Sequence, residues 1–65
     1  MPLFRVKVTF DRKNMVTGRL EKNSVRESEF SSTDAESARE GYLARVKRNE
    51  PTLVKVNKVD VKQII

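Results

Sequence analysis

The side chains of this sequence that could do chemistry include no thiol and no imidazole, because its 65 residues contain neither cysteine nor histidine. The chain therefore has no thiol or imidazole to act as nucleophile or base, no disulfide, and no thiolate or imidazole metal ligand. Glu27 and Glu29 come closest to an acid/base pair, since residues two apart on a strand share a face. Such a pair needs a cleft that shifts one pKa, and so small a sheet can hardly build one. We therefore expect no enzyme activity, no cofactor and no metal.

Glycine occurs only at positions 18 and 41, which excludes a glycine-rich phosphate loop. Gly41 falls inside a predicted helix, where glycine costs about 1 kcal/mol relative to alanine. It is interpreted either as a tolerated surface residue, which is the preferred interpretation, or as a point where another backbone or a partner approaches closely.

Positive charge is the main functional signal. The net charge of +5 belongs to residues 1–26, and the remainder of the chain is neutral overall. Clustered cations can bind phosphate with salt-dependent, sequence-tolerant affinity, although strands also carry lysine and arginine for solubility and to discourage edge pairing. The predicted phosphate contacts are Arg5, Lys7, Arg12, Lys13, Arg19 and Lys22. Arg5 and Lys7, with Arg19 and Lys22 from the neighbouring strand, could form a basic sheet surface.

Two strands joined by a hairpin must position these cations. Apolar and polar residues alternate from Leu3 to Phe10, as in a half-buried strand. A turn follows within 11–18, and its tip could be either of two groups, 11–14 or 16–18. The returning segment, 19–31, alternates imperfectly, so a bulge or break near Asn23 and Ser24 is expected if Leu20, Val25 and Phe30 all face the core.

A helix should follow. Thr33 with Glu36 three residues later predicts a capping box, and Pro51 predicts a helix end near Asn49. Basic residues 45, 47 and 48 at the helix end either offset the helix dipole, which is preferred, or bind phosphate. The apolar face predicted for the helix consists of Ala35, Ala38, Tyr42, Leu43 and Val46.

The last segment, 52–65, is rich in β-branched residues and predicts a strand. Its apolar phase slips at Asn57 and Lys58, which favours a bulged single strand over a second hairpin. The chain is thus predicted to be a single basic α+β domain over residues 1–65. Its fold would be ββαβ, with a three-stranded, mainly antiparallel sheet and one helix on one face.

Aromatic residues are not placed for base stacking. Phe4 and Phe10 fall on the core side of the first strand, and Phe30 is expected to join them. Tyr42 remains as the one semi-exposed ring, so stacking of single-stranded bases is not expected. Met15 in the polar loop is the exposed apolar residue that could adapt to a protein partner.

The turn Val16-Thr17-Gly18-Arg19, the cap Ser32-Thr33-Asp34-Ala35-Glu36 and the spacing to the final strand resemble small uncharacterised proteins encoded by bacteriophages. The resemblance covers most of the chain and implies a small accessory factor that acts on nucleic acid or on a host protein. It transfers no functional residue.

The expected function is non-enzymatic binding of nucleic acid, DNA or RNA, through the basic N-terminal hairpin. The alternative is a protein-interaction module, such as a viral accessory factor or inhibitor that docks on an acidic host protein. No apolar run is long enough to cross a membrane or to form a signal peptide, so we expect no membrane partner and a cytoplasmic location, the host cytoplasm if the protein is viral. A homodimer is also expected, because Ile64 and Ile65 are hard to cover in one small domain.

Overall fold

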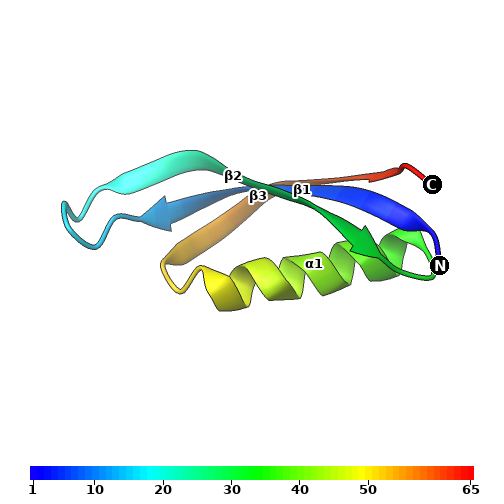
Figure 1. Cartoon of the computed structure of the whole chain (residues 1–65). Helices are drawn as coiled ribbons and strands as arrows, with labels where there is room; N and C mark the ends of the chain where they lie inside the picture. The colour runs from blue at the N-terminus through cyan, green and yellow to red at the C-terminus, as the bar shows by residue number, and fades with distance from the viewer.

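The computed structural model describes all 65 residues and confirms the predicted ββαβ arrangement. The elements are β1 (Leu3–Lys13), β2 (Leu20–Ser31), α1 (Ala35–Asn49) and β3 (Leu53–Gln63). The sheet has the order β2-β1-β3 with both pairings antiparallel, so β1 is central. Helix α1 covers one face and leaves the other face bare, and the molecule is elongated, 42 × 17 × 14 Å (Figure 1).

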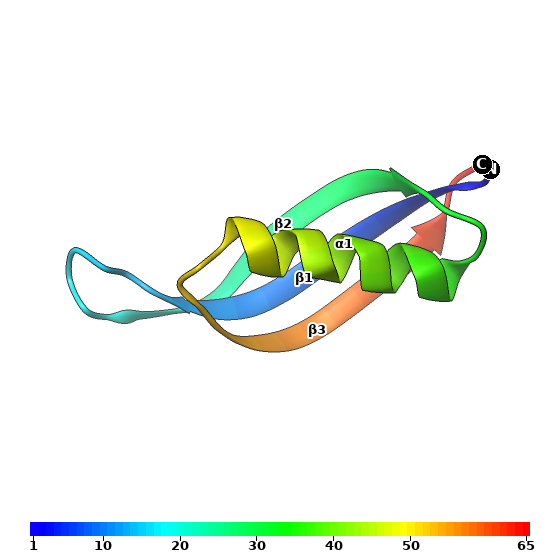
Figure 2. The ribbon, with the colours of Figure 1, turned by 90° about the horizontal axis from the view of Figure 1, so that it is seen from below.

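The core follows from the alternation in β1. Phe4, Val6, Val8 and Phe10 are buried under α1, while Arg5 and Lys7 between them are exposed. Ala38, Tyr42 and Val46 complete the buried cluster from the helix side, and residues of β2, β3 and α1 pack around it. Seen from below, α1 crosses the sheet diagonally (Figure 2), and it lies against β1 and β3 more than against β2. One face of the sheet is therefore free, and β2 is exposed over most of its length.

The helix begins one residue later than the predicted capping box implies. Asp34 is the N-cap, in extended conformation, and its carboxylate accepts a hydrogen bond from the Ser37 backbone N–H at 2.7 Å. This hydrogen bond lowers the pKa of Asp34, because it stabilises the charged form. The Thr33–Glu36 box was thus wrong by one position, because the carboxylate of Asp34, and not the Thr33 hydroxyl, accepts the capping hydrogen bond. The predicted end at Asn49 is confirmed.

Three predictions about helix residues were wrong, although Ala38, Tyr42 and Val46 are buried on the predicted apolar face. Ala35 is exposed, at the first turn. Tyr42 is only 6% exposed, because its ring enters the core and meets Phe30 edge-on, with ring centres 6.4 Å apart. Gly41 is not a tolerated surface residue: a Cβ there would lie 2.7 Å from Cζ of Phe30. The close approach at Gly41 is therefore made by the Phe30 side chain of the same domain.

The two interruptions of alternation predicted in the outer strands are β-bulges. The Asp11 carboxylate of the central strand forms hydrogen bonds to a residue in each bulge. In β2 the register with β1 shifts opposite Asp11, and Asn23 adopts a left-handed conformation with φ 58°. In β3 the register shifts at Asn57 and again at Val54. The Asp11 carboxylate accepts hydrogen bonds from the Asn57 amide at 2.8 Å and the Asn23 backbone N–H at 3.2 Å, which together lower its pKa. Val25, however, is half exposed on the bare face, so the β2 bulge does not bring it to the core.

The last residues lie beside the start of β1. The backbone N–H of Ile64 donates to the Leu3 carbonyl at 2.9 Å, and Ile65 is 79% exposed.

The helix α1 is too short and too polar to cross a membrane.

Candidate nucleic-acid interface

The fold divides the six cations predicted to bind phosphate into three groups. Arg5 and Lys7 lie on the bare face of the sheet, opposite α1. Arg12 lies on the helix side, in contact with a residue at the end of α1. The other three, Lys13, Arg19 and Lys22, belong to the far end of the β1–β2 hairpin. The expected continuous basic surface is therefore absent, and each group needs its own interpretation.

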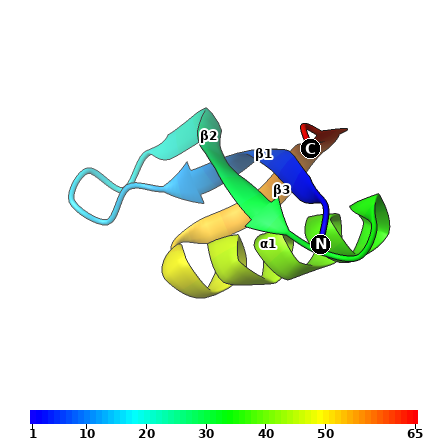
Figure 3. The same cartoon turned by 45° about the vertical axis from the view of Figure 1, so that its right-hand side comes forward.

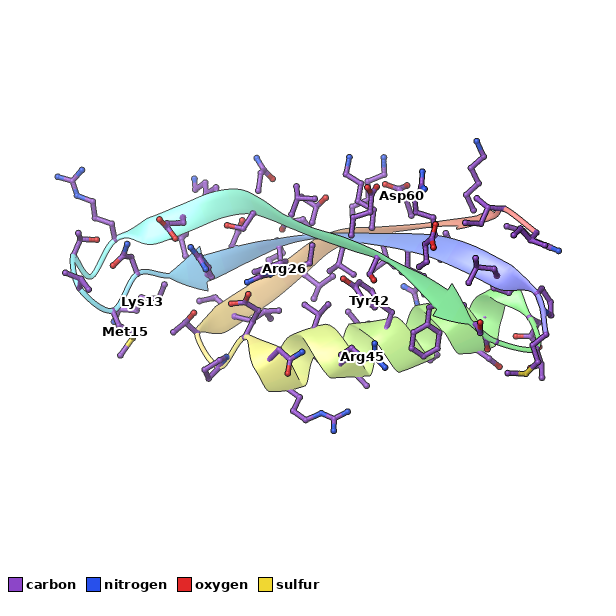
Figure 4. The ribbon with its side chains drawn as sticks, in the orientation of Figure 1. Lys13, Met15, Arg26, Tyr42, Arg45 and Asp60 are labelled. Carbon is purple, nitrogen blue, oxygen red and sulfur yellow. The ribbon has the colours of Figure 1, made fainter.

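Acidic neighbours surround the cations on the bare face. Glu29 is paired opposite Arg5 in the sheet, and their side chains form an ion pair at 3.5 Å. Lys7 lies between Glu27 on β2 and Asp60 on β3. In Figure 4, Asp60 points away from the sheet on the side opposite α1. The prediction that Arg19 and Lys22 flank Arg5 and Lys7 was thus wrong, because the register places acidic residues of β2 there.

Arg12 is held by two carboxylates, those of Glu21 and Glu50. Its Nε donates to Glu21 Oε1 at 2.7 Å, and its Nη1 lies 3.7 Å from Glu50 Oε2. The bond to Glu21 raises the pKa of Arg12 and, in the other direction, lowers that of Glu21, to which the Asn14 amide also donates. These partners hold the guanidinium against the hairpin, so it is less free than its neighbours to bind phosphate.

Glu50 is the acidic residue that anchors this region. It lies directly after α1, only 7% exposed, and its carboxylate accepts hydrogen bonds from the Arg26 guanidinium, one of them from Nε at 2.7 Å. Glu50 thus connects the end of the helix to β2 through Arg26 and to β1 through Arg12. Because a buried carboxylate without partners would be costly, this cluster fixes the base of the hairpin against the helix.

Beyond this base the hairpin extends as an arm, defined here as Arg12–Lys22. The first residue of β3, Leu53, pairs with Arg12, so the end of the arm has no third strand. Figures 1 and 3 show the arm projecting past the end of α1. The sequence left two positions open for its tip, and the structure places the tip at residues 15–18, between the paired Asn14 and Arg19.

Within the arm the one acidic residue, Glu21, pairs with Arg12, and Asp11 of β1 lies close enough to Lys22 to interact with its charge. Lys13, Arg19 and Lys22 form no ion pair, in contrast to Arg12. Lys13 and Met15 lie together near the tip in Figure 4. A shallow depression of about 190 Å³ lies along one side of the arm, lined by Arg12, Lys13, Asn14, Met15, Glu21 and Thr52. Exposed, unpaired cations on a projecting ribbon can reach a phosphate backbone without a clash from the rest of the domain.

Sequence reasoning missed a row of lysines on the third strand. Lys55, Lys58 and Lys62 all lie on the bare face, opposite Asp11, Thr9 and Arg5 of β1. Simple alternation puts Lys55 on the other face from Lys58 and Lys62, but the bulge at Asn57 restores a common side. The bulge was predicted from the sequence. Applying the change of face that it causes to the lysines on either side would have predicted that all three lie on one face. Arg5 and Lys62 are like charges directly opposite each other, an arrangement that an anion would relieve.

Comparison with known proteins adds nothing to this geometry. No protein family, curated protein or solved structure matches the chain.

Proposed function

We propose that this protein binds nucleic acid without catalysing a reaction on it, and that the arm is its principal contact. The observation that carries the proposal is the position of Lys13, Arg19 and Lys22, which are unpaired on a projecting two-stranded ribbon. Phosphate contacts by such cations release counterions and give affinity that falls steeply with salt. The arm is therefore the part of the molecule best suited to a polyanion.

On the bare face of the sheet, the basic surface of the arm continues along β1 and β3 but not along β2. Along β1 and β3 cations outnumber acidic groups, through Arg5, Lys7 and the lysine row of β3. Along β2 the bare face presents Glu27 and Glu29. A phosphate backbone leaving the arm would therefore follow β1 and β3 and avoid β2, because like charges repel.

Binding is tested by fluorescence anisotropy with duplex DNA, single-stranded DNA and RNA between about 50 and 200 mM salt. The double variant Lys13→Ala/Arg19→Ala should reduce the slope of log affinity against log salt by about 2, since each lost phosphate contact removes about 0.9. The matched control is Lys47→Ala/Arg48→Ala, which removes the same charge from the exposed last turn of α1. The control should keep most of the slope.

Absence of binding to all three nucleic acids at the lowest salt would refute the proposal. Equal losses in the arm variant and the helix control would also count against it, because binding would then follow net charge and not the arm. If nucleic acid does not bind, and a stoichiometric protein is retained from nuclease-treated lysate, the protein-interaction alternative takes its place.

A further inference from the structure

The tip of the arm carries apolar side chains that nothing in the fold covers. Val16 is 94% exposed and Met15 75%, and Leu20 at the foot of the tip is 48% exposed. Val16 is the most exposed large apolar residue of the chain. A turn that only had to reverse the chain would be expected to carry polar residues there. The side chains at positions 15 and 16 contribute little to stability, so their apolar character needs another explanation.

The turn that presents these side chains is well ordered by its own hydrogen bonds. Oδ1 of Asn14 accepts from the backbone N–H groups of Val16 at 2.9 Å and Thr17 at 3.1 Å. Gly18, with φ 75°, donates its N–H to the Asn14 carbonyl at 2.7 Å, and the Thr17 hydroxyl accepts from the Arg19 N–H. The polar side chains of the tip are thus engaged within the turn, and the apolar ones are left pointing outward as a preformed unit.

We propose that Met15 and Val16 form a wedge that enters the minor groove of duplex DNA and packs against a base step, bending the duplex. The inference rests on the proposed function and names its substrate. Apolar wedges of this kind unstack a step and kink DNA by roughly 20–90°. Lys13 and Arg19, directly beside the tip, are placed to contact the phosphates on either side of the opened groove.

The rest of the molecule favours duplex DNA over other nucleic acids. Stacking of single-stranded bases needs exposed rings, but Phe4, Phe10 and Tyr42 are buried and the ring of Phe30 is covered by the Arg45 guanidinium, 5.2 Å from its centre. Duplex RNA is recognised across a wide, shallow minor groove through its 2′-hydroxyls, whereas the most exposed side chains of the tip, Met15 and Val16, are apolar. With no group to read base edges, the wedge selects by deformability and prefers flexible pyrimidine–purine steps.

Bending is measured by energy transfer between dyes at the two ends of a duplex of about 30 base pairs. The wild-type protein should shorten the distance between the ends. The variant Met15→Ser/Val16→Ser should bind about tenfold more weakly, with an unchanged salt slope, and should lose the bend. Ile65→Ser, which removes an exposed apolar side chain at the far end of the molecule, is the control and should bend as the wild type does. Circular dichroism checks that both variants are folded.

The outcomes separate the wedge from the proposed function. Salt-dependent binding to duplex DNA without a bend, or a bend that survives in Met15→Ser/Val16→Ser, overturns the wedge and leaves nucleic-acid binding in place. Tighter binding to single strands or to duplex RNA than to duplex DNA overturns the choice of substrate. Failure to bind any nucleic acid overturns both. Binding to vesicles of anionic phosphatidylglycerol that depends on Met15 and Val16, without binding to DNA, assigns the tip to a membrane surface and also overturns the wedge.

Discussion

Replacing Gly41 by alanine should destabilise the protein, although alanine is the better helix former. The substitution gains about 1 kcal/mol in helix propensity. The added Cβ, however, would lie 2.7 Å from Cζ and 2.9 Å from Cε2 of Phe30, closer than carbon atoms approach. Since the helix backbone cannot easily retreat from the sheet, the ring of Phe30 has to move outward.

The cost of that movement follows from the contacts of the ring. Phe30 meets Tyr42 edge-on, a pair that contributes about 0.5–1.5 kcal/mol, and it carries the Arg45 guanidinium above it, which contributes about 0.5–1 kcal/mol at an exposed site. The ring is partly buried against the core, and exposing it costs about 1–2 kcal/mol more. Subtracting the helix gain leaves a net destabilisation of about 1–3.5 kcal/mol.

The measurement is thermal and urea unfolding followed by circular dichroism, with each kcal/mol corresponding to roughly 4–8 °C in Tm for a domain of this size. Measuring Gly41→Ala in a second background, which lacks the Phe30 ring, tests whether contact with that ring causes the destabilisation. In a Phe30→Ala background there is no ring to displace, so Gly41→Ala should become stabilising by up to about 1 kcal/mol. A change of sign between the two backgrounds is therefore the expected result. If Gly41→Ala stabilises the wild-type protein, or destabilises both backgrounds equally, the argument from the Phe30 contact is refuted.

Three further predictions follow from the charges and the surface. Glu50→Gln should lower the free energy of unfolding by about 1–2 kcal/mol, because it weakens the hydrogen bonds to Arg26, and urea unfolding that matches the wild type would contradict this. Asp11, Glu21 and Asp34 have lowered pKa values in the folded state. Their contribution to the free energy of unfolding is therefore complete above the pKa of an ordinary carboxyl group, and it is lost as the pH falls through the lowered pKa values. Tm should therefore decline from about pH 5 to about pH 2, and a flat profile there would show that these hydrogen bonds do not stabilise the fold. The homodimer predicted from Ile64 and the exposed Ile65 is checked by light scattering at micromolar concentration, where the mass of a single chain, unchanged on dilution, would exclude it.

Local pattern was enough to predict the elements, their order and the end of the helix. Alternation from Phe4 to Phe10 depends only on the two-residue repeat of a strand, and Pro51 disfavours a helical conformation at the residue before it. The bulge at Asn57 was also visible, because a phase slip between valines leaves few other ways to bury them. These features are set by residues close together in sequence, so the sequence alone determined them.

Long-range contacts decided what the sequence left open or indicated wrongly. Asp11 meets Asn23 and Asn57 only because β2 and β3 flank β1, so neither partner could be read from its neighbours in the chain. The role of Gly41 likewise depends on Phe30, a residue of another element that packs over it.

The distribution of charge was decided in the same way. Basic residues 1–26 looked like one surface in sequence, but strand register placed Glu29 beside Arg5 and the end of the helix placed Glu50 beside Arg12. Composition fixed the total charge of the chain. Which cations stay unpaired is a property of cross-strand and helix–sheet distances, and only the tertiary structure sets those, because electrostatic interactions act through space and not along the chain.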